Sequence, residues 1–513
     1  MLWQILIWVL VGIVCFIATK EFITWFRLKK FAKQGFATYY FPMVGNLFPI
    51  LEGMKTKNGY SHYVKLAQET KGKPGIAMNN GYSFSSNITL FDIDVVREFL
   101  SIEHQVCLRV PFFDLKTNLG FLMETGERAF HQRAVLSTIF HRDNLNRIAP
   151  EIYTTVQKRF ESAKITKADS EDMKFGVHQN SQKFLEELMT DFTQNLVYPS
   201  SIKIPKSKAG LILAEELNAI CEIAMSPRAG SNLSNFLFLG LPHYLNLLPG
   251  SREAKRRGSD LQRIFEDCFS QRQRDLDQKT QAELDKIPFN IIDAMLLHNK
   301  KAAASGALSE VLTLRELAGN CNVFTFASYD TTLTATTGVF FFLGQNPEIQ
   351  SQLAQEIQKS SISTGIKNID TIDDCSMLNE FVAESLRIYS PAVMTFDRLV
   401  LKDFKIGKLE FFKGDYINAG IGQNLWDPSY FASGRTFAMN NRNSSNKKCF
   451  IPFSTGRRAC IGQLLAELEL KQILLYVLPR YKVLPLSKPE DVKYSLNIAM
   501  KLDNCFVKLV PRN

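Results

Sequence analysis

Residues 453–462 read FSTGRRACIG and set a single cysteine, Cys460, in a loop punctuated by glycine. Phe453, Gly456 and Gly462 are placed to let the backbone turn tightly around the sulfur, because glycine adopts dihedral angles that other residues avoid. The apolar stretch from about residue 463 to 478 predicts a helix whose N-terminal amides point at the loop and favour an anionic sulfur. The pattern therefore predicts a thiolate that can serve as an axial ligand of a haem iron.

Two other roles for Cys460 compete with this interpretation. A lone intracellular cysteine is most often a buried free thiol. A zinc site needs further ligands at short spacing, and the nearest other cysteine, Cys449, has no histidine close by. The five pattern residues fixed around Cys460 favour the haem ligand. With them, the loop resembles that of the haem-thiolate monooxygenases, the cytochrome P450 family.

Glu384 and Arg387 lie three residues apart, so they share one face of a predicted helix. Alone, such a pair would indicate a solvated ion pair that contributes little. The pair lies at the family's typical distance before Cys460, and the resemblance implies that it is buried and joined by a later arginine. Arg435 matches that third, structural position, with Ser433 where the family usually has proline.

Residues 326–332 read FASYDTT, inside a helical stretch that begins near Leu312. They resemble the family's oxygen-activating segment, which implies that Asp330 and Thr331 are catalytic and relay protons. Ser328 replaces the usual glycine. Serine can still bend a helix, because its hydroxyl bonds the carbonyl four residues back.

The resemblance also implies a binding site for haem b, with iron protoporphyrin IX as the cofactor and Cys460 as its metal ligand. Arg133 matches the arginine of the family's WxxxR helix, although Ala129 replaces the tryptophan. Arg398 and Arg458 match two further contacts to the haem propionates. A planar, permanently charged guanidinium suits that role.

The first nineteen residues are almost wholly apolar and are followed by a basic flank. Nineteen helical residues span about 30 Å, the thickness of a bilayer core, and a positive flank stays cytoplasmic. We therefore expect a transmembrane signal anchor over 1–19, a basic flank and linker over 20–41, and a single-pass protein of the endoplasmic reticulum whose catalytic domain faces the cytosol. Residues 41–46 resemble the family's proline hinge.

The rest of the chain, residues 42–513, shows no internal repeat and no low-complexity linker. We expect one large, mainly α-helical domain with a small β component, the cytochrome P450 fold that the resemblance implies. A regular helix is predicted over residues 347–359. Strands are predicted over residues 398–400 and 404–409.

The nine cysteines form no CxxC pairs, which fits a reducing compartment. The net charge of +10 is spread along the chain without a nucleic-acid motif, so it favours an anionic membrane surface and an acidic electron donor over nucleic acid. The expected donors are an NADPH-dependent flavoprotein reductase and, as a second, a small haem protein. Four basic residues are candidates for docking the reductase, against the alternative of an ordinary solvated surface: Arg128, Lys447, Lys448 and Arg457.

These features predict a membrane-bound monooxygenase that inserts one atom of dioxygen into a lipophilic organic substrate. The apolar run over 236–242 is a candidate lid, and Phe112, Phe113, Ala499 and Met500 fall where the family lines its pocket. Two alternatives remain: a hydroperoxide isomerase or lyase of the same fold, and a non-enzymatic haem sensor. The presence of Asp330 and Thr331 argues against both, and the sequence does not identify the substrate.

Overall fold

The computed structural model describes residues 2–40, 70, 72–79, 85–109, 120–163, 174–175, 179–202, 249–496 and 500–512. The predicted proline hinge over 41–46 and the candidate lid over 236–242 lie outside these residues. Of the four candidate pocket residues, Phe112, Phe113 and Ala499 also lie outside them, whereas Met500 is described and buried.

The chain is mainly helical with a small sheet component, as the sequence predicts. The helices are α1 (Leu2–Lys33), α4 (Ile93–Val106), α5 (Gly120–Met123), α6 (Gly126–Ser137), α7 (Arg142–Ser162), α8 (Gln179–Val197), α12 (Pro249–Asp277), α13 (Gln281–Leu284), α14 (Ile291–Ala304), α15 (Leu314–Gln345), α16 (Pro347–Lys359), α17 (Ser376–Ile388), α18 (Ile421–Trp426) and α19 (Gln463–Arg480). The strands are β1 (Ala37–Tyr39), β2 (Gly75–Asn79), β3 (Ser86–Leu90), β4 (Cys107–Arg109), β5 (Lys174–Phe175), β6 (Arg398–Val400), β7 (Phe404–Ile406), β8 (Leu409–Phe411), β9 (Tyr416–Ala419), β10 (Tyr481–Pro485), β11 (Lys493–Leu496), β12 (Met500–Asp503) and β13 (Val507–Pro511).

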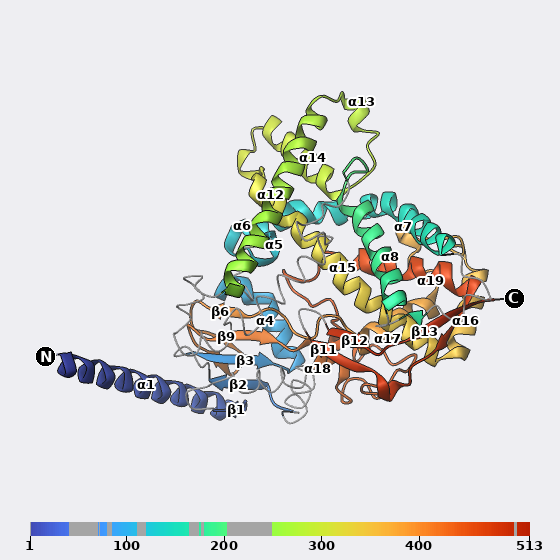
Figure 1. Cartoon of the computed structure of the whole chain (residues 1–513). Coiled ribbons are helices and arrows are strands. Elements are labelled where there is room, and N and C mark those ends of the chain that lie inside the picture. The colour runs from blue at the N-terminus through green and yellow to red at the C-terminus, as the bar shows by residue number, and fades with distance from the viewer. Residues whose placement is uncertain are drawn as a thin grey trace.

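Within the described residues, the largest sheet has six strands in the order β1-β2-β3-β9-β6-β4. It joins segments far apart in sequence: β3 pairs in parallel with β9, with Ile88 opposite Ile417, and β4 pairs antiparallel with β6. The sheet lies beside α1, at the end of the molecule nearest the N-terminus, and most of the helices lie in the rest of the molecule together with strands such as β11, β12 and β13 (Figure 1). The β4–β6 pairing carries Arg109 and Arg398 side by side into the site described below.

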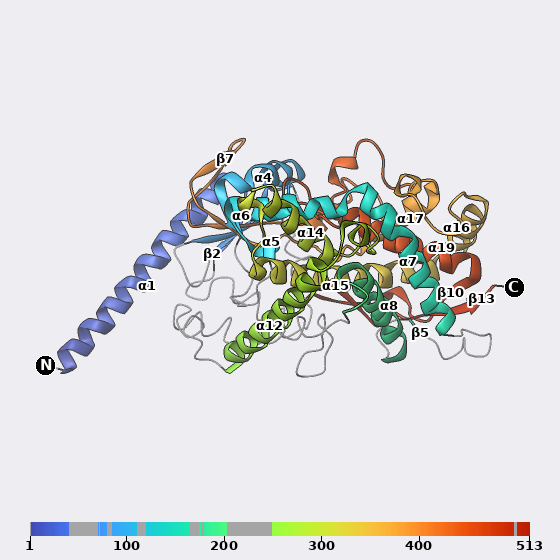
Figure 2. The same cartoon turned by 90° about the horizontal axis from the view of Figure 1, so that it is seen from above.

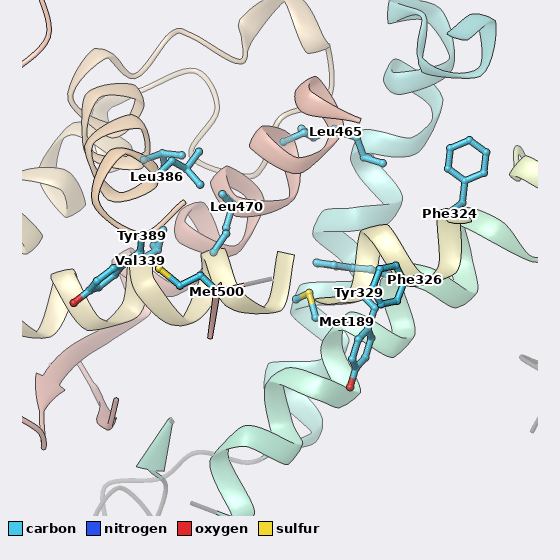
Figure 3. Close-up of a cluster of buried hydrophobic side chains, with 14 of the residues drawn as sticks. Met189, Phe324, Phe326, Tyr329, Val339, Leu386, Tyr389, Leu465, Leu470 and Met500 are labelled. Atoms are coloured by element: carbon cyan, nitrogen blue, oxygen red, sulfur yellow. The ribbon is translucent and has the colours of Figure 1, made fainter. Parts of the chain in front are cut away.

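The central helix is α15, which spans 32 residues and is buried over most of its length. It begins with a capping box in which Thr313 and Glu316 bond each other's backbone N–H groups. It contacts α8, α12, α17 and α19 and crosses the middle of the molecule (Figures 1 and 2). Phe326 and Tyr329 of α15 lie with Met189 of α8 in the buried apolar cluster of Figure 3.

The helix α1 has two halves with different surroundings. In the C-terminal half, Leu28 and Phe31 are buried in the main core and Arg27 pairs with Asp415 at 2.8 Å. The N-terminal half projects from the body (Figures 1 and 2). It exposes large apolar side chains, including Trp3 and Trp8. Nevertheless, none of the helices in the described ranges combines the length and the apolar character needed to cross a membrane, so the predicted span over 1–19 is not confirmed.

Two of the predicted local elements are confirmed, and one needs revision. The predicted helix over 347–359 is α16 and the predicted strand over 398–400 is β6. The segment 404–409 was expected to be one strand but is the start of a hairpin, β7 and β8, because Gly407 takes a left-handed conformation with φ of 53°. Residues 20–33, expected as a flank and linker, are helical, and Leu28 and Phe31 among them are buried in the main core.

Candidate functional site

The loop that carries Cys460 is closed by its own backbone. The Cys460 N–H donates to the carbonyl oxygen of Phe453 at 3.0 Å, and α19 begins three residues after the cysteine. Gly456 has a φ of 79°, and a Cβ there would lie 2.2 Å from the carbonyl oxygen of Leu100, so only glycine fits.

The prediction that Gly462 also supplies a special dihedral angle is wrong. Its φ is −93°, which any residue adopts, and Ser454 instead takes the second left-handed turn with φ of 63°. A Cβ on Gly462 would meet nothing within 4 Å in the described chain. The space beside Gly462 is therefore open, as a cofactor seated against the loop requires.

The side chain of Cys460 is exposed, whereas the competing candidate Cys449 is buried. Desolvation by the protein groups around Cys460 raises the pKa of its thiol, and the Gly462 N–H and the charge of Arg133 oppose that shift. Desolvation raises the pKa of Cys449 to about 11. Cys460 thus has open surface, an amide donor and a nearby cation, the surroundings that favour a metal-bound thiolate.

Three predicted haem-binding arginines converge near this loop from different elements. Arg133 of α6 donates to the carbonyl oxygen of Ala459 at 2.7 Å. Arg458 donates to the carbonyl oxygens of Phe121 and Glu124 at 2.9 and 2.7 Å. Arg398 of β6 is buried and pairs with Glu103 of α4.

A fourth arginine, Arg109 of β4, joins this cluster. Burial, followed by the charges of Arg398 and Arg458, lowers the pKa of Arg109 well below its ordinary value. Burial likewise lowers the pKa of Arg458 to about 10, with Arg133 and Arg398 contributing. The Nε atom of Arg109 is buried and has no hydrogen-bond partner within the described chain.

A pocket opens between these arginines, lined by Glu103, His104, Cys107, Leu108, Arg109, Thr125, Gly126, Phe130, Arg398 and Arg458. Three of the four guanidinium groups, those of Arg109, Arg398 and Arg458, line this pocket, and the buried carboxylate of Glu103 is an opposing charge for all three. Such an excess of desolvated positive charge fits a ligand with two carboxylates. The thiol, the open side of Gly462 and the arginines together fit a haem with its two propionates.

Sequence reasoning missed both Arg109 and Glu103. Glu103 had a detectable signal, because it stands on the buried stripe of α4 with Val96, Phe99 and Leu100, where a charge is unexpected. Arg109 had none, because it ends a three-residue strand and its neighbours come from distant parts of the chain.

The residues predicted to relay protons lie in the middle of α15. Asp330 is buried, whereas Thr331 is partly exposed and its hydroxyl donates to the carbonyl oxygen of Ala327 at 2.6 Å. Ala327 and Ser328 are also partly exposed, in a helix that is otherwise mostly buried. Within the described residues, the Ser328 hydroxyl lies 3.3 Å from that of Thr193 on α8 and makes no hydrogen bond to the carbonyl of Phe324.

Glu384 and Arg387 form a fully buried pair on α17, with Nε–Oε2 and Nη2–Oε1 distances of 2.7 and 2.8 Å. The burial of both side chains excludes the alternative of a solvated ion pair on the surface. Arg387 also donates to the carbonyl oxygens of Leu425 at 2.7 Å and Thr436 at 3.0 Å, and to the hydroxyl of Ser433 at 3.0 Å. Ser433, in the place of the usual proline, therefore helps to fix the segment before the cysteine loop.

Arg435, the predicted third member, lies in this segment, and its guanidinium stacks over the rings of Trp426 and Tyr494 at 4.8 and 5.0 Å. The Glu384 carboxylate accepts hydrogen bonds from Arg387 and from the Ala438 N–H, the latter at 3.0 Å. Arg435 thus holds the segment through aromatic packing.

The four candidate docking residues differ in what they already bind. Arg128 is bound to Glu316, in the first turn of α15, at 2.6 Å and to the carbonyl oxygens of Ser309 and Val311. Lys448 is exposed and pairs with Asp94 at 2.6 Å. Lys447 is exposed, and the exposed Arg457 stacks on Phe130 at 4.6 Å.

Known proteins resemble this chain over much of its length. The family model described as Cytochrome P450 matches residues 37–509. The chain is 29% identical over 265 residues to Cytochrome P450 4c21 of Blattella germanica, covering 50% of this chain and 48% of that protein. It is 24% identical over 436 residues to Cytokinin hydroxylase of Arabidopsis thaliana, covering 82% and 77%, and 29% identical over 206 residues to Cytochrome P450 3A12 of Canis lupus familiaris, covering 39% and 40%. The cysteine loop, the buried Glu384–Arg387 pair and a match over nearly the whole chain lead to one conclusion: the chain belongs to the cytochrome P450 family of haem-thiolate monooxygenases.

Proposed function

We propose that this chain inserts one atom of dioxygen into a lipophilic organic substrate, with electrons from NADPH delivered by a flavoprotein reductase. The observation that carries the proposal is the convergence of Arg109, Arg398 and Arg458 on one pocket and of Arg133 on the loop of the exposed Cys460, just before α19. When bound, haem b with a thiolate ligand supplies the reduction and cleavage of dioxygen.

In this proposal Cys460 ligates the iron, and Phe453, Gly456 and Gly462 shape the loop behind the sulfur. Arg133, Arg398 and Arg458, with Arg109 added, hold the propionates. Arg387 and Glu384 fix the segment that leads to the loop. Each of these residues binds or orients and does not itself react.

Asp330 and Thr331 move protons on the other side of the site. The Thr331 hydroxyl bonds the carbonyl of Ala327 in the described chain and lies on the partly exposed face of α15. From there it can give its proton to a group bound at that face and recover one from Asp330, its neighbour in sequence.

The proposed location is the endoplasmic-reticulum membrane, with the N-terminal half of α1 held in the lipid and the body in the cytosol. The exposed Trp3, Trp8 and Phe16 of α1 and the basic side chains that follow support this location. The proposed docking surface for the reductase comprises Arg457 and Lys447, which are exposed near the cysteine loop.

The test is reconstitution of the purified protein with haem, NADPH and a P450 reductase, followed over a panel of steroids, fatty acids and xenobiotics. Thr331→Ala should still bind substrate and accept electrons, but release peroxide in place of product. Thr337→Ala is the matched control, because Thr337 also bonds the carbonyl four residues back on α15, that of Leu333, at 2.9 Å. Equal product per NADPH in Thr331→Ala and wild type, with full activity in Asp330→Asn, would overturn the proposal and favour a hydroperoxide isomerase or a haem sensor.

A further inference from the structure

The helix α12 is held in the molecule mainly by its C-terminal part. Four apolar side chains are buried along one face of that part: Leu261, Phe265, Phe269 and Leu276. Arg272 is buried there too and pairs with Asp293 of α14 at 2.7 Å. Residues 251–260, by contrast, read SREAKRRGSD and contain no large apolar residue. This N-terminal part therefore opens at a lower free-energy cost than the rest of the helix, and its end reaches the edge of the molecule in Figure 2.

The N-terminal part of α12 carries a serine in a basic setting. Residues 256–259 read RRGS, so Ser259 follows two arginines that stand two and three positions before it. A serine kinase whose substrate groove is lined by carboxylates selects a serine in this position, because the two guanidinium groups pair with those carboxylates. The side chain of Arg256 is 64% exposed, and its pair with Asp260 is loose, at 3.9 Å. Arg256 is therefore available to such a groove.

A kinase binds its substrate as an extended segment, so the residues around Ser259 have to leave the helix for a moment. The Ser259 side chain is partly exposed, and its hydroxyl donates to the carbonyl oxygen of Lys255 at 2.9 Å. Gly258, directly before the serine, is among the poorest helix formers. The lack of apolar anchors and the glycine both favour local opening at the serine.

We propose that Ser259 is a phosphorylation site of this chain, modified by a serine kinase that recognises basic residues. The Ser259 oxygen attacks the γ-phosphorus of ATP, the bond from that phosphorus to the oxygen bridging to the β-phosphate breaks, and ADP leaves. The hydroxyl proton passes to the catalytic base of the kinase. The site goes beyond the proposed reaction and does not depend on it.

Once the helix closes again, its own cations hold the phosphate. Lys255 and Arg263 stand four residues before and after Ser259, and Arg256 stands three residues before it, so all three lie one turn away. Arg256 and Arg263 are exposed. A phosphoserine carries a charge of about −1.5 to −2 and three acceptor oxygens, which guanidinium groups bind strongly. The phosphate thus stabilises the part of α12 that opens for the kinase.

The first experiment incubates the haem-loaded protein with Mg-ATP and the catalytic subunit of the cyclic-AMP-dependent protein kinase, and maps the phosphate by mass spectrometry. Ser259 should carry the phosphate, and Arg256→Ala should slow its incorporation several-fold. Ser270 is the internal control and should stay unmodified. It lies on the same helix, is partly exposed and bonds the carbonyl four residues back, that of Glu266, at 2.8 Å, but no arginine stands among the three residues before it.

No phosphate on Ser259, or equal labelling of Ser270, would overturn the proposal whether or not the enzyme is active. The second experiment follows the phosphate by phosphorus NMR across a pH titration. The second pKa of a phosphoserine is about 6, and in the folded protein it should be lower, because the cations favour the doubly charged form. Arg263→Gln should raise it, whereas Arg274→Gln, a change at an exposed arginine far along the same helix, should not. An equal pKa in the folded and the urea-unfolded protein would contradict a phosphate held by α12.

Discussion

At Gly456, the backbone conformation and the packing both exclude a side chain. A comparison of two glycines separates these effects, because Gly456 and Gly72 have nearly the same φ, 79° and 77°, but a Cβ on Gly72 would meet no described residue within 4 Å. Gly72→Ala should cost about 1 to 2 kcal/mol for the left-handed conformation alone. Gly456→Ala should cost more and lower haem content, because its Cβ would collide with the carbonyl oxygen of Leu100.

Thermal unfolding and the haem-to-protein ratio check this prediction. Equal destabilisation of the two alanine variants would show that the loop moves away from Leu100 and that the collision is not what selects glycine at position 456.

The buried pair on α17 gives a second prediction at this scale. Glu384→Gln leaves the guanidinium of Arg387 without its charged partner, and breaking a fully buried pair costs about 3 to 5 kcal/mol. Lys405→Ala breaks an exposed pair with Glu410, whose side chains are 69% and 46% exposed, and should change stability by less than about 0.5 kcal/mol. Denaturant unfolding of both variants measures the difference, and similar values would mean that Arg387 finds other partners.

Among the elements, α1 is attached to the body by a buried ion pair as well as by the apolar packing of Leu28 and Phe31. Asp415 is fully buried, accepts the N–H of Ser86 at 2.8 Å and is paired with Arg27 at the same distance. Burial raises the pKa of Asp415 to about 6 in spite of these bonds, so removal of Arg27 should raise it further. Arg27→Ala should cost about 1 to 3 kcal/mol and loosen the C-terminal half of α1.

Limited trypsin digestion tests the loosening, because Lys29 and Lys30 become cleavable when the helix detaches. Lys413→Ala is the control, since Arg27 bonds the backbone carbonyl of Lys413 and not its side chain. Cleavage in α1 at the wild-type rate in Arg27→Ala would show that Leu28 and Phe31 hold the helix without the ion pair.

Local elements also show how far the sequence determines the site. Cys460 and its glycines are close together in sequence, and so are Glu384 and Arg387. The spacing within each group therefore predicts the geometry of that group. The partnership of Arg398 with Glu103, and the approach of Arg109, require α4, β4 and β6 to meet, which no local pattern encodes. The hairpin at Gly407 was missed for a different reason: glycine permits a left-handed turn but does not demand one.

For the whole molecule, buried carboxyl groups determine how stability varies with pH. Burial raises the pKa of Glu469 from its ordinary 4.5 to about 8, so between these values the folded chain holds a proton that the unfolded chain has released. The free energy of unfolding therefore falls as pH rises through this window, by at most about 1.4 kcal/mol per pH unit for this group. Glu469→Gln should flatten the slope, because glutamine does not titrate.

Urea unfolding at several pH values from about 5 to about 8 measures the slope. Asp415 contributes with the same sign up to about pH 6, so the effect of Glu469→Gln should be clearest above that value. An unchanged slope in the variant would mean that Glu469 is ionised in the folded chain.

Because α1 is continuous from Leu2 to Lys33, without a proline, the attachment of its C-terminal half has a consequence for orientation. A straight helix of that length extends about 48 Å, and here one end is embedded in the body of the protein. If another structure holds residues 2–19, the helix therefore fixes the tilt and the rotation of the body relative to that structure, as well as the distance between the two. The body then cannot tumble as it would on a flexible tether, and its site keeps one orientation relative to the structure that holds the helix.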